Sequence, residues 1–185
     1  MSINVSVIST ANSTRHFALN SVESISHLLI NLKRSSRIFT GNLLIIGSGA
    51  QTEIFSTASI ACVEMESEND LEVYLPRGQN LALTSLTTVE AIEPFVGGLE
   101  SEFFKVQIDF FFRGGHVIHT CVEGDPKLAL DECLVNLTGV FEQPCLAYRL
   151  PQGGIGLMNP LAMTRLVIIP GIPDLPKEAW VADDL

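Results

Sequence analysis

Alternating apolar and polar residues predict several half-buried β-strands along this chain. The alternation begins at Ile3, returns over residues 71–75, and is clearest from Glu102 to Phe112. A turn with two glycines follows this last segment and leads into residues 116–123, so the two segments are expected to form a hairpin. The polar stretch from Ser9 to Asn20 is expected to be a loop or a weak helix.

Other segments are apolar without a decisive period. Asn42–Ile46 precedes a glycine-containing turn and is predicted to be a strand, as are Cys145–Leu150 and Leu161–Ile169. Gln51–Glu66 fits a helical stripe as well as a strand, but the turn before it favours the second strand of a hairpin. Leu81–Ile92 fits either a pair of strands or a short helix.

Two segments have apolar residues at helical spacing. The first runs from about Ser21 to Arg34, where Asn20 is the expected N-cap and Glu23 completes a capping-box pattern. The second begins at Asp125, with Pro126 at its first position. No repeat of fixed period is visible, and strands do not alternate regularly with helices. We therefore predict an α+β fold, mainly an antiparallel β-sheet packed against two principal helices.

The length of 185 residues is close to that of one ordinary domain. We expect residues 1–185 to form a single domain, with a Pro-rich extended C-terminal tail from about residue 170. Hydrophobic residues make up 46% of the chain and charged residues 17%, whereas about 25% charged residues is typical of soluble domains. This surplus of apolar residues favours a homo-oligomer interface, and an apolar ligand pocket is the alternative.

Several classes of function and location are disfavoured. The apolar runs are far shorter than the roughly 20 residues that span a bilayer, and no basic-then-apolar signal follows Met1, so we expect a cytoplasmic protein without a membrane partner. A net charge of −10 repels phosphate backbones and disfavours nucleic acid. The four cysteines form no C-x-x-C motif, which favours buried free thiols over disulfides or a metal site. Nothing in the sequence indicates a cofactor.

Two glycine-containing segments resemble fragments of nucleotide-binding loops. The segment Gly47-Ser48-Gly49 lacks the third glycine of a dinucleotide fingerprint, so a plain hairpin turn is favoured. The segment with Gly153, Gly154 and Gly156 lacks the Lys and Ser/Thr of a P-loop, so a flexible connection between strands is favoured. Its three glycines are nevertheless candidate ligand-contact residues, because mobile loops carry function more often than cores do.

His119 and Cys121 lie two positions apart on a predicted strand and therefore share one face. If the turn before them has two residues, both side chains face the core. If the turn has three residues, Arg113 to Gly115, His119 lies outside near Asp109, and the His–Cys–Asp group resembles a thiol-activation site. A structural role is favoured for all three. The carboxylates at 64, 66, 68 and 70 are expected to form a solvated turn rather than a cation site.

Two hypotheses of function follow. The favoured one is a non-catalytic interaction or regulatory domain that is homo-oligomeric and binds a protein partner or a small ligand. The alternative is a small-molecule-binding domain or a small thiol-dependent enzyme, with a pocket near His119, Cys121 and the Gly153–Gly156 loop. The first rests on the apolar surplus and on the lack of a sequence pattern that brings catalytic groups together.

Overall fold

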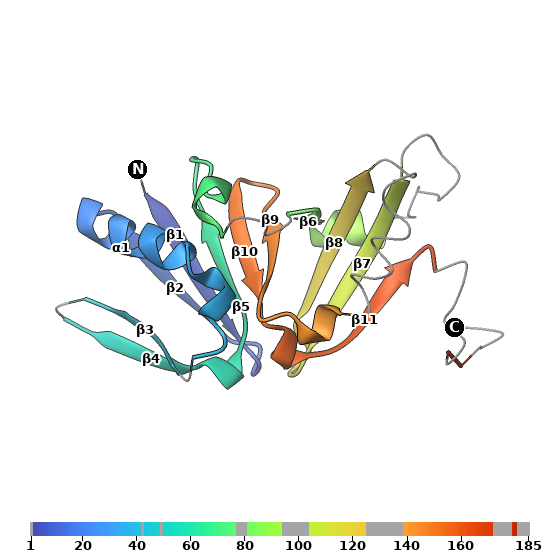
Figure 1. The fold of residues 1–185 in the computed structure, drawn as a ribbon, viewed down its shortest axis with the longest axis horizontal. Helices are drawn as coiled ribbons and strands as arrows, with labels where there is room; N and C mark the ends of the chain where they lie inside the picture. The colour runs from blue at the N-terminus through green and yellow to red at the C-terminus, as the bar shows by residue number, and fades with distance from the viewer. Residues whose placement is uncertain are drawn as a thin grey trace.

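A large β-sheet dominates the computed structural model, which describes residues 2–41, 43–48, 50–76, 81–93, 104–124, 139–171 and 179–180. The strands are β1 (Ile3–Ser9), β2 (Thr14–Leu19), β3 (Leu43–Gly47), β4 (Thr52–Ser56), β5 (Ile60–Glu66), β6 (Leu83–Ser85), β7 (Phe104–Phe112), β8 (Val117–Gly124), β9 (Leu146–Arg149), β10 (Gly154–Met158) and β11 (Met163–Ile169). Nine of them form one sheet in the order β11-β7-β8-β6-β9-β10-β5-β1-β2, and β3 pairs with β4 separately (Figure 1).

The helical elements of the described residues are short. They are the helices α1 (Val22–Leu32) and α2 (Thr88–Ile92) and the 3₁₀ turns η1 (Ser35–Arg37), η2 (Thr57–Ser59), η3 (Glu72–Tyr74), η4 (Val140–Glu142) and η5 (Pro160–Ala162). All strand pairs are antiparallel except β6 with β9, which makes a parallel bridge. The prediction of an α+β fold that is mainly antiparallel is therefore confirmed. One of the two predicted principal helices is α1, and the one expected from Asp125 lies outside the described residues.

The structure contradicts two of the local predictions. The loop or weak helix over 9–20 is wrong, because β2 pairs along β1 and turns Phe17 and Leu19 toward the core. The strand expected over 71–75 is also wrong. Asp70 Oδ1 accepts a hydrogen bond from Glu72 N at 2.8 Å, which starts the 3₁₀ turn η3 instead.

Other boundaries need smaller corrections. Gln51–Glu66 is strand, as favoured, but η2 divides it into β4 and β5. Leu81–Ile92 contains both a strand, β6, and a short helix, α2. The cap of α1 is Ser21 rather than Asn20, since the Ser21 side chain accepts from Ser24 N. Leu161–Ile169 begins in η5, and β11 starts at Met163.

The order of the strands in residues 3–66 returns among the described strands of residues 104–169, although no repeat is visible in the sequence. Each of these two repeat units contains a hairpin, a second hairpin, a 3₁₀ turn and a last strand that pairs with the first. In the first repeat unit these strands are β1 to β5. In the second repeat unit their equivalents, in the same order, are β7 to β11.

Equivalent backbone hydrogen bonds recur 103 positions apart (112 − 9 = 103). The pairs are Ser9 N to Ser13 O (2.9 Å) with Phe112 N to His116 O (2.9 Å), and Thr10 N to Ser59 O (2.8 Å) with Arg113 N to Ala162 O (2.9 Å). The same spacing relates two register shifts, one that skips Ala61 in β5 and one that skips Thr164 in β11. The described parts of these two repeat units are therefore a structural duplication, with matching strands, turns and bulges.

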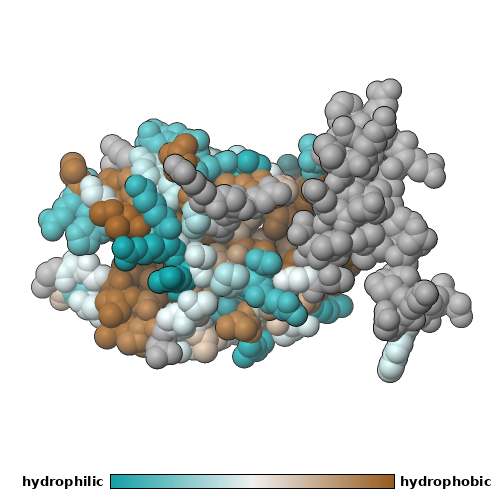
Figure 2. All heavy atoms as spheres, in the orientation of Figure 1, coloured by the Kyte–Doolittle hydropathy of each residue, from teal (hydrophilic) through white to brown (hydrophobic). Residues whose placement is uncertain are grey.

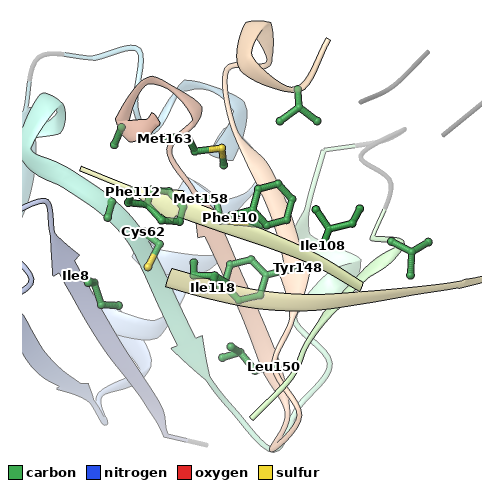
Figure 3. Packing of buried hydrophobic residues seen from close by; sticks show 14 of the residues in the cluster. Ile8, Cys62, Ile108, Phe110, Phe112, Ile118, Tyr148, Leu150, Met158 and Met163 are labelled. Carbon is green, nitrogen blue, oxygen red and sulfur yellow. The ribbon is translucent and has the colours of Figure 1, made fainter. Parts of the chain in front are cut away.

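Two hydrophobic cores correspond to the two repeat units. The first core lies between α1, the β3–β4 hairpin and one face of β1 and β5, and it includes Ile25, Leu32 and Val63. The second core lies on the face of β7 and β8 that carries Ile108, Phe110 and Ile118, and it includes Tyr148 (Figure 3). In Figure 1 the two halves of the sheet diverge on either side of β6.

The β9–β10 hairpin joins the two cores. It belongs to the second repeat unit, yet β10 pairs with β5 of the first repeat unit. One of its faces places Tyr148 and Met158 in the second core. The opposite face places Ala147, Ile155 and Leu157 in the first core. This hairpin is thus buried on both faces.

Candidate functional site

His119 lies beside Asp109, as the three-residue turn requires. The hairpin pairs Asp109 with His119 and closes with Phe112 N donating to His116 O, so Arg113 to Gly115 form the turn. His119 Nδ1 is a buried nitrogen that lies 2.8 Å from Asp109 Oδ1, in a geometry that is not an aligned hydrogen bond. Asp109 Oδ1 also accepts from Gln107 Nε2 at 3.0 Å.

The Cys121 thiol is not prepared for nucleophilic chemistry. Burial raises its pKa, and the nearby Lys105 ammonium offsets this only in part. The thiol makes long contacts with Val122 O at 3.8 Å and Glu123 Oε1 at 3.9 Å. A catalytic cysteine needs a lowered pKa, so this environment favours a structural thiol.

The duplication gives His119 a structural explanation. Its equivalent 103 positions earlier is His16, whose Nδ1 lies 2.9 Å from Ser6 Oγ. Ser6 is in turn the equivalent of Asp109. A histidine paired with a polar residue on the neighbouring strand is therefore a feature of the hairpin in both repeat units. This recurrence favours a role in folding over a role in catalysis.

The three candidate glycines serve the packing of the β9–β10 hairpin. Gly153 and Gly154 have φ values of 101° and 103° and form its turn. A Cβ on Gly154 would collide with the carbonyl of Met65. Gly156 lies under the Tyr148 ring, which a Cβ would strike. No interaction of the described residues brings these glycines together with His119.

A buried polar cluster around Tyr148 was missed by sequence reasoning. Tyr148 donates a hydrogen bond to Glu64 Oε1 at 2.7 Å, and the Cys62 thiol lies 3.7 Å from His116 Nε2. Burial is the largest cause that raises the pKa of Cys62, Glu64 and Tyr148 and lowers that of His116. Glu64 is thus no part of a solvated acidic turn. Tyr148 is 84 positions from Glu64, and no local pattern connects them.

Gly47 belongs to a hairpin, as favoured. It pairs with Thr52, and β4 follows the turn, so no helix N-terminus is present to bind a phosphate. Gly49 lies outside the described residues.

A groove of about 1160 Å³ lies between α1, the end of β2 and the length of β3. Apolar residues of the first core, among them Val5, Leu28 and Met65, contribute to its lining. Polar side chains such as His27 and Arg37 line it too. The groove is far in sequence from the predicted pocket near His119 and Cys121, and neither of those residues lines it.

The outer face of the β3–β4 hairpin exposes large apolar side chains. Leu43, Ile45 and Ile54 are 57%, 59% and 61% exposed. In Figure 2 apolar side chains gather over this hairpin at the lower left of the molecule. We call these three residues the exposed hairpin face. A group of large apolar side chains exposed side by side typically marks an interaction surface.

Comparisons with known proteins return nothing for this chain: no family model, no curated protein and no solved structure matches it. Within the described residues no helix is long and apolar enough to cross a membrane. The same part of the chain contains no group of three His, Cys, Asp or Glu side chains arranged to hold a metal ion.

Proposed function

We propose that this protein is a non-catalytic interaction domain that works as a homo-oligomer. The exposed hairpin face carries the proposal. Ile54 of this face lies in β4, and the equivalent strand of the second repeat unit is β10. The residue of β10 that is 103 positions after Ile54 is Leu157, which is fully buried. The same face of the hairpin is thus apolar in both repeat units, but it is covered in only one of them.

The equivalence extends to the paired strand. The cross-strand pair Leu44 with Phe55 corresponds to Leu146 with Met158, so β3 matches β9 at a spacing of 102 positions. Ile45 then corresponds to Ala147, which is 3% exposed. Burying a large aliphatic side chain contributes about 1.5–3 kcal/mol. Covering the exposed hairpin face with a second copy therefore supplies a substantial driving force for association.

The alternative of a thiol-dependent enzyme has weaker support. Cys121 has a raised pKa, and His119 contacts Asp109 rather than this thiol. A general acid–base site needs groups that converge on a space where substrate can bind. The groove instead lies against α1 and β3.

The groove supports a second candidate function, the binding of an extended peptide strand. In the second repeat unit β6 lies between β8 and β9, where Thr84 pairs with both Cys121 and Arg149. The equivalent positions in the first repeat unit are Ala18 and Gly47, and both line the groove. A peptide could add to β2 there as β6 adds to β8. Titration with a peptide of residues 81–87 should shift the amide resonances of Ala18 and Gly47, and unchanged resonances would refute this candidate.

Sedimentation velocity of the wild type and of Ile54→Lys tests the proposal of self-association. We expect the wild type to be heavier than its 20.1 kDa chain, and Ile54→Lys to shift toward monomer because it places a charge in the interface. Val22→Lys is the matched control, since Val22 is 84% exposed on α1 and does not line the groove between α1 and the hairpin. A wild type that stays monomeric at about 100 μM, near the weak end of specific association, would overturn the proposal.

A further inference from the structure

The strands that join the two repeat units each have a counterpart in the other repeat unit that is not used in this way. Within the chain, β10 of the second repeat unit pairs with β5 of the first over five residue pairs, from Gly154 with Glu66 to Met158 with Cys62. The equivalent of β10 in the first repeat unit is β4, and the equivalent of β5 in the second repeat unit is β11. Among the described strands, β4 pairs only with β3, and β11 pairs only with β7. Within the described part of the chain, each of these two strands therefore has one edge without a strand partner.

We infer that β4 of one copy pairs antiparallel with β11 of a second copy, and so repeats between chains the joint that β10 and β5 form within the chain. The inference rests on the proposed self-association and names the two surfaces that meet. It also fixes the register, because residues 155–158 of β10 have their equivalents in β4 103 positions earlier, and each residue of β5 has its equivalent in β11 103 positions later. The expected pairs are Thr52 with Ile168, Glu53 with Val167, Ile54 with Leu166, and Phe55 with Arg165.

Burial supports this register. In the internal joint Leu157 lies opposite Val63, and the two side chains are 0% and 3% exposed. Their equivalents are Ile54, which is largely exposed, and Leu166, which is only partly buried against the second core. Ile54 in β4 and Leu166 in β11 are thus both less buried than their equivalents in the internal joint. A second copy supplies each strand with the apolar neighbour that its equivalent already has.

The apolar character of the two strand edges also supports the β4–β11 joint. An exposed edge strand that carries apolar side chains readily pairs with another chain, and proteins usually protect such edges with charges or a covering element. β11 ends in Val167, Ile168 and Ile169, and Ile169 is exposed. A β4–β11 contact is heterologous, because it joins two different surfaces of the protein. Repeated from copy to copy, it builds either a closed ring or an open filament.

Disulfide trapping tests the register directly. One chain carries Ile54→Cys and another carries Leu166→Cys, so that a bond between positions 54 and 166 must join two molecules. Opposite residues of antiparallel strands have Cα atoms about 4.5–5.5 Å apart, which lies within disulfide range. After the two chains are mixed and oxidised with copper–phenanthroline, peptide mapping should identify the 54–166 bond.

Two further mixtures guard against misinterpretation. Thr52→Cys with Ile168→Cys probes the other end of the same register, and it serves if Leu166→Cys fails to fold. Ile54→Cys with Val22→Cys is the control, since both side chains are exposed but not paired, and it should give no bond above background.

The outcomes separate the two levels of the proposal. Bonds in both predicted pairs, without a bond in the control, support the β4–β11 joint. If the wild type associates in sedimentation but neither predicted pair forms a bond, the joint is wrong while self-association stands. If the wild type is monomeric, both are overturned.

Discussion

Replacing Gly156 by alanine should destabilise the protein through Tyr148. Gly156 pairs with Tyr148 across β9 and β10, and the aromatic ring lies directly over the glycine. A methyl group at position 156 would overlap the ring, and the ring must therefore move. Tyr148 is completely buried among residues such as Phe110 and Ile118 (Figure 3), so little free space exists to receive it.

The magnitude follows from two losses. Forcing an additional methyl group into a packed core costs about 1–3 kcal/mol. Displacing the ring also breaks the 2.7 Å hydrogen bond from Tyr148 to Glu64, and a hydrogen bond to a charged group contributes about 1.5–3 kcal/mol. Since the ring can relax in part, we expect a loss of about 3 kcal/mol in the free energy of unfolding. For a chain of this length that corresponds to a fall in Tm of roughly 6–12 °C.

Urea denaturation followed by circular dichroism measures this loss. Gly171→Ala is the matched control, because a Cβ there meets no atom within 4 Å, and its stability should stay within about 0.5 kcal/mol of wild type. Tyr148→Phe separates the two contributions, since it removes the hydroxyl and keeps the ring. A Gly156→Ala protein as stable as the control would refute the proposed contact between this glycine and the tyrosine.

The remaining predictions concern pH, a buried amide and thiol reactivity. Burial raises the pKa of Glu64 above its ordinary value of 4.5. The folded protein therefore binds this proton more tightly than the unfolded chain does, and its stability falls as pH rises above 4.5. Glu64→Gln should flatten this slope in urea midpoints measured from pH 4 to 7, and an unchanged slope would contradict the raised pKa of Glu64. Asn159 is buried and donates to two main-chain carbonyls at 3.1 and 2.8 Å, so Asn159→Ala should cost about 2–3 kcal/mol in the same assay, and a loss under about 0.5 kcal/mol would be inconsistent with these bonds. Burial raises the pKa of Cys145 to about 12 and also raises those of Cys62 and Cys121, so iodoacetamide labelling read by peptide mass spectrometry should modify these three only after unfolding; rapid native labelling of Cys121 would revive the enzyme hypothesis.

Much of the strand pattern could be predicted because alternation is a local property. The segments around Ile3 and from Glu102 to Phe112 alternate cleanly, and both are strands. β2 escaped prediction because most of its positions are exposed and only Phe17 and Leu19 pack against the core. Its strand conformation depends on the partner β1, which no window around residues 14–19 reveals.

The duplication escaped prediction for a related reason. The two repeat units share backbone geometry and apolar character more than residue identity, as Val5 and Ile108 or Val63 and Leu166 illustrate, and the pair His16 and His119 is an exception. The contact of His119 with Asp109 was foreseen as one of two alternatives, because the length of a hairpin turn sets the register. The Tyr148–Glu64 contact could not be foreseen, since it depends on β10 inserting beside β5.

Amide hydrogen exchange of β4 at two protein concentrations tests whether the exposed hairpin face is an interface between copies. Residues 52–56 form an edge strand in one copy, and pairing with a second copy would protect their amides. Exchange in this segment should slow as the protein is concentrated from about 1 μM to 100 μM, the range over which moderate self-association appears, while exchange in α1 should not change. Equal exchange of residues 52–56 at both concentrations, in a sample that sediments as an oligomer when concentrated, would show that the exposed hairpin face is not the interface.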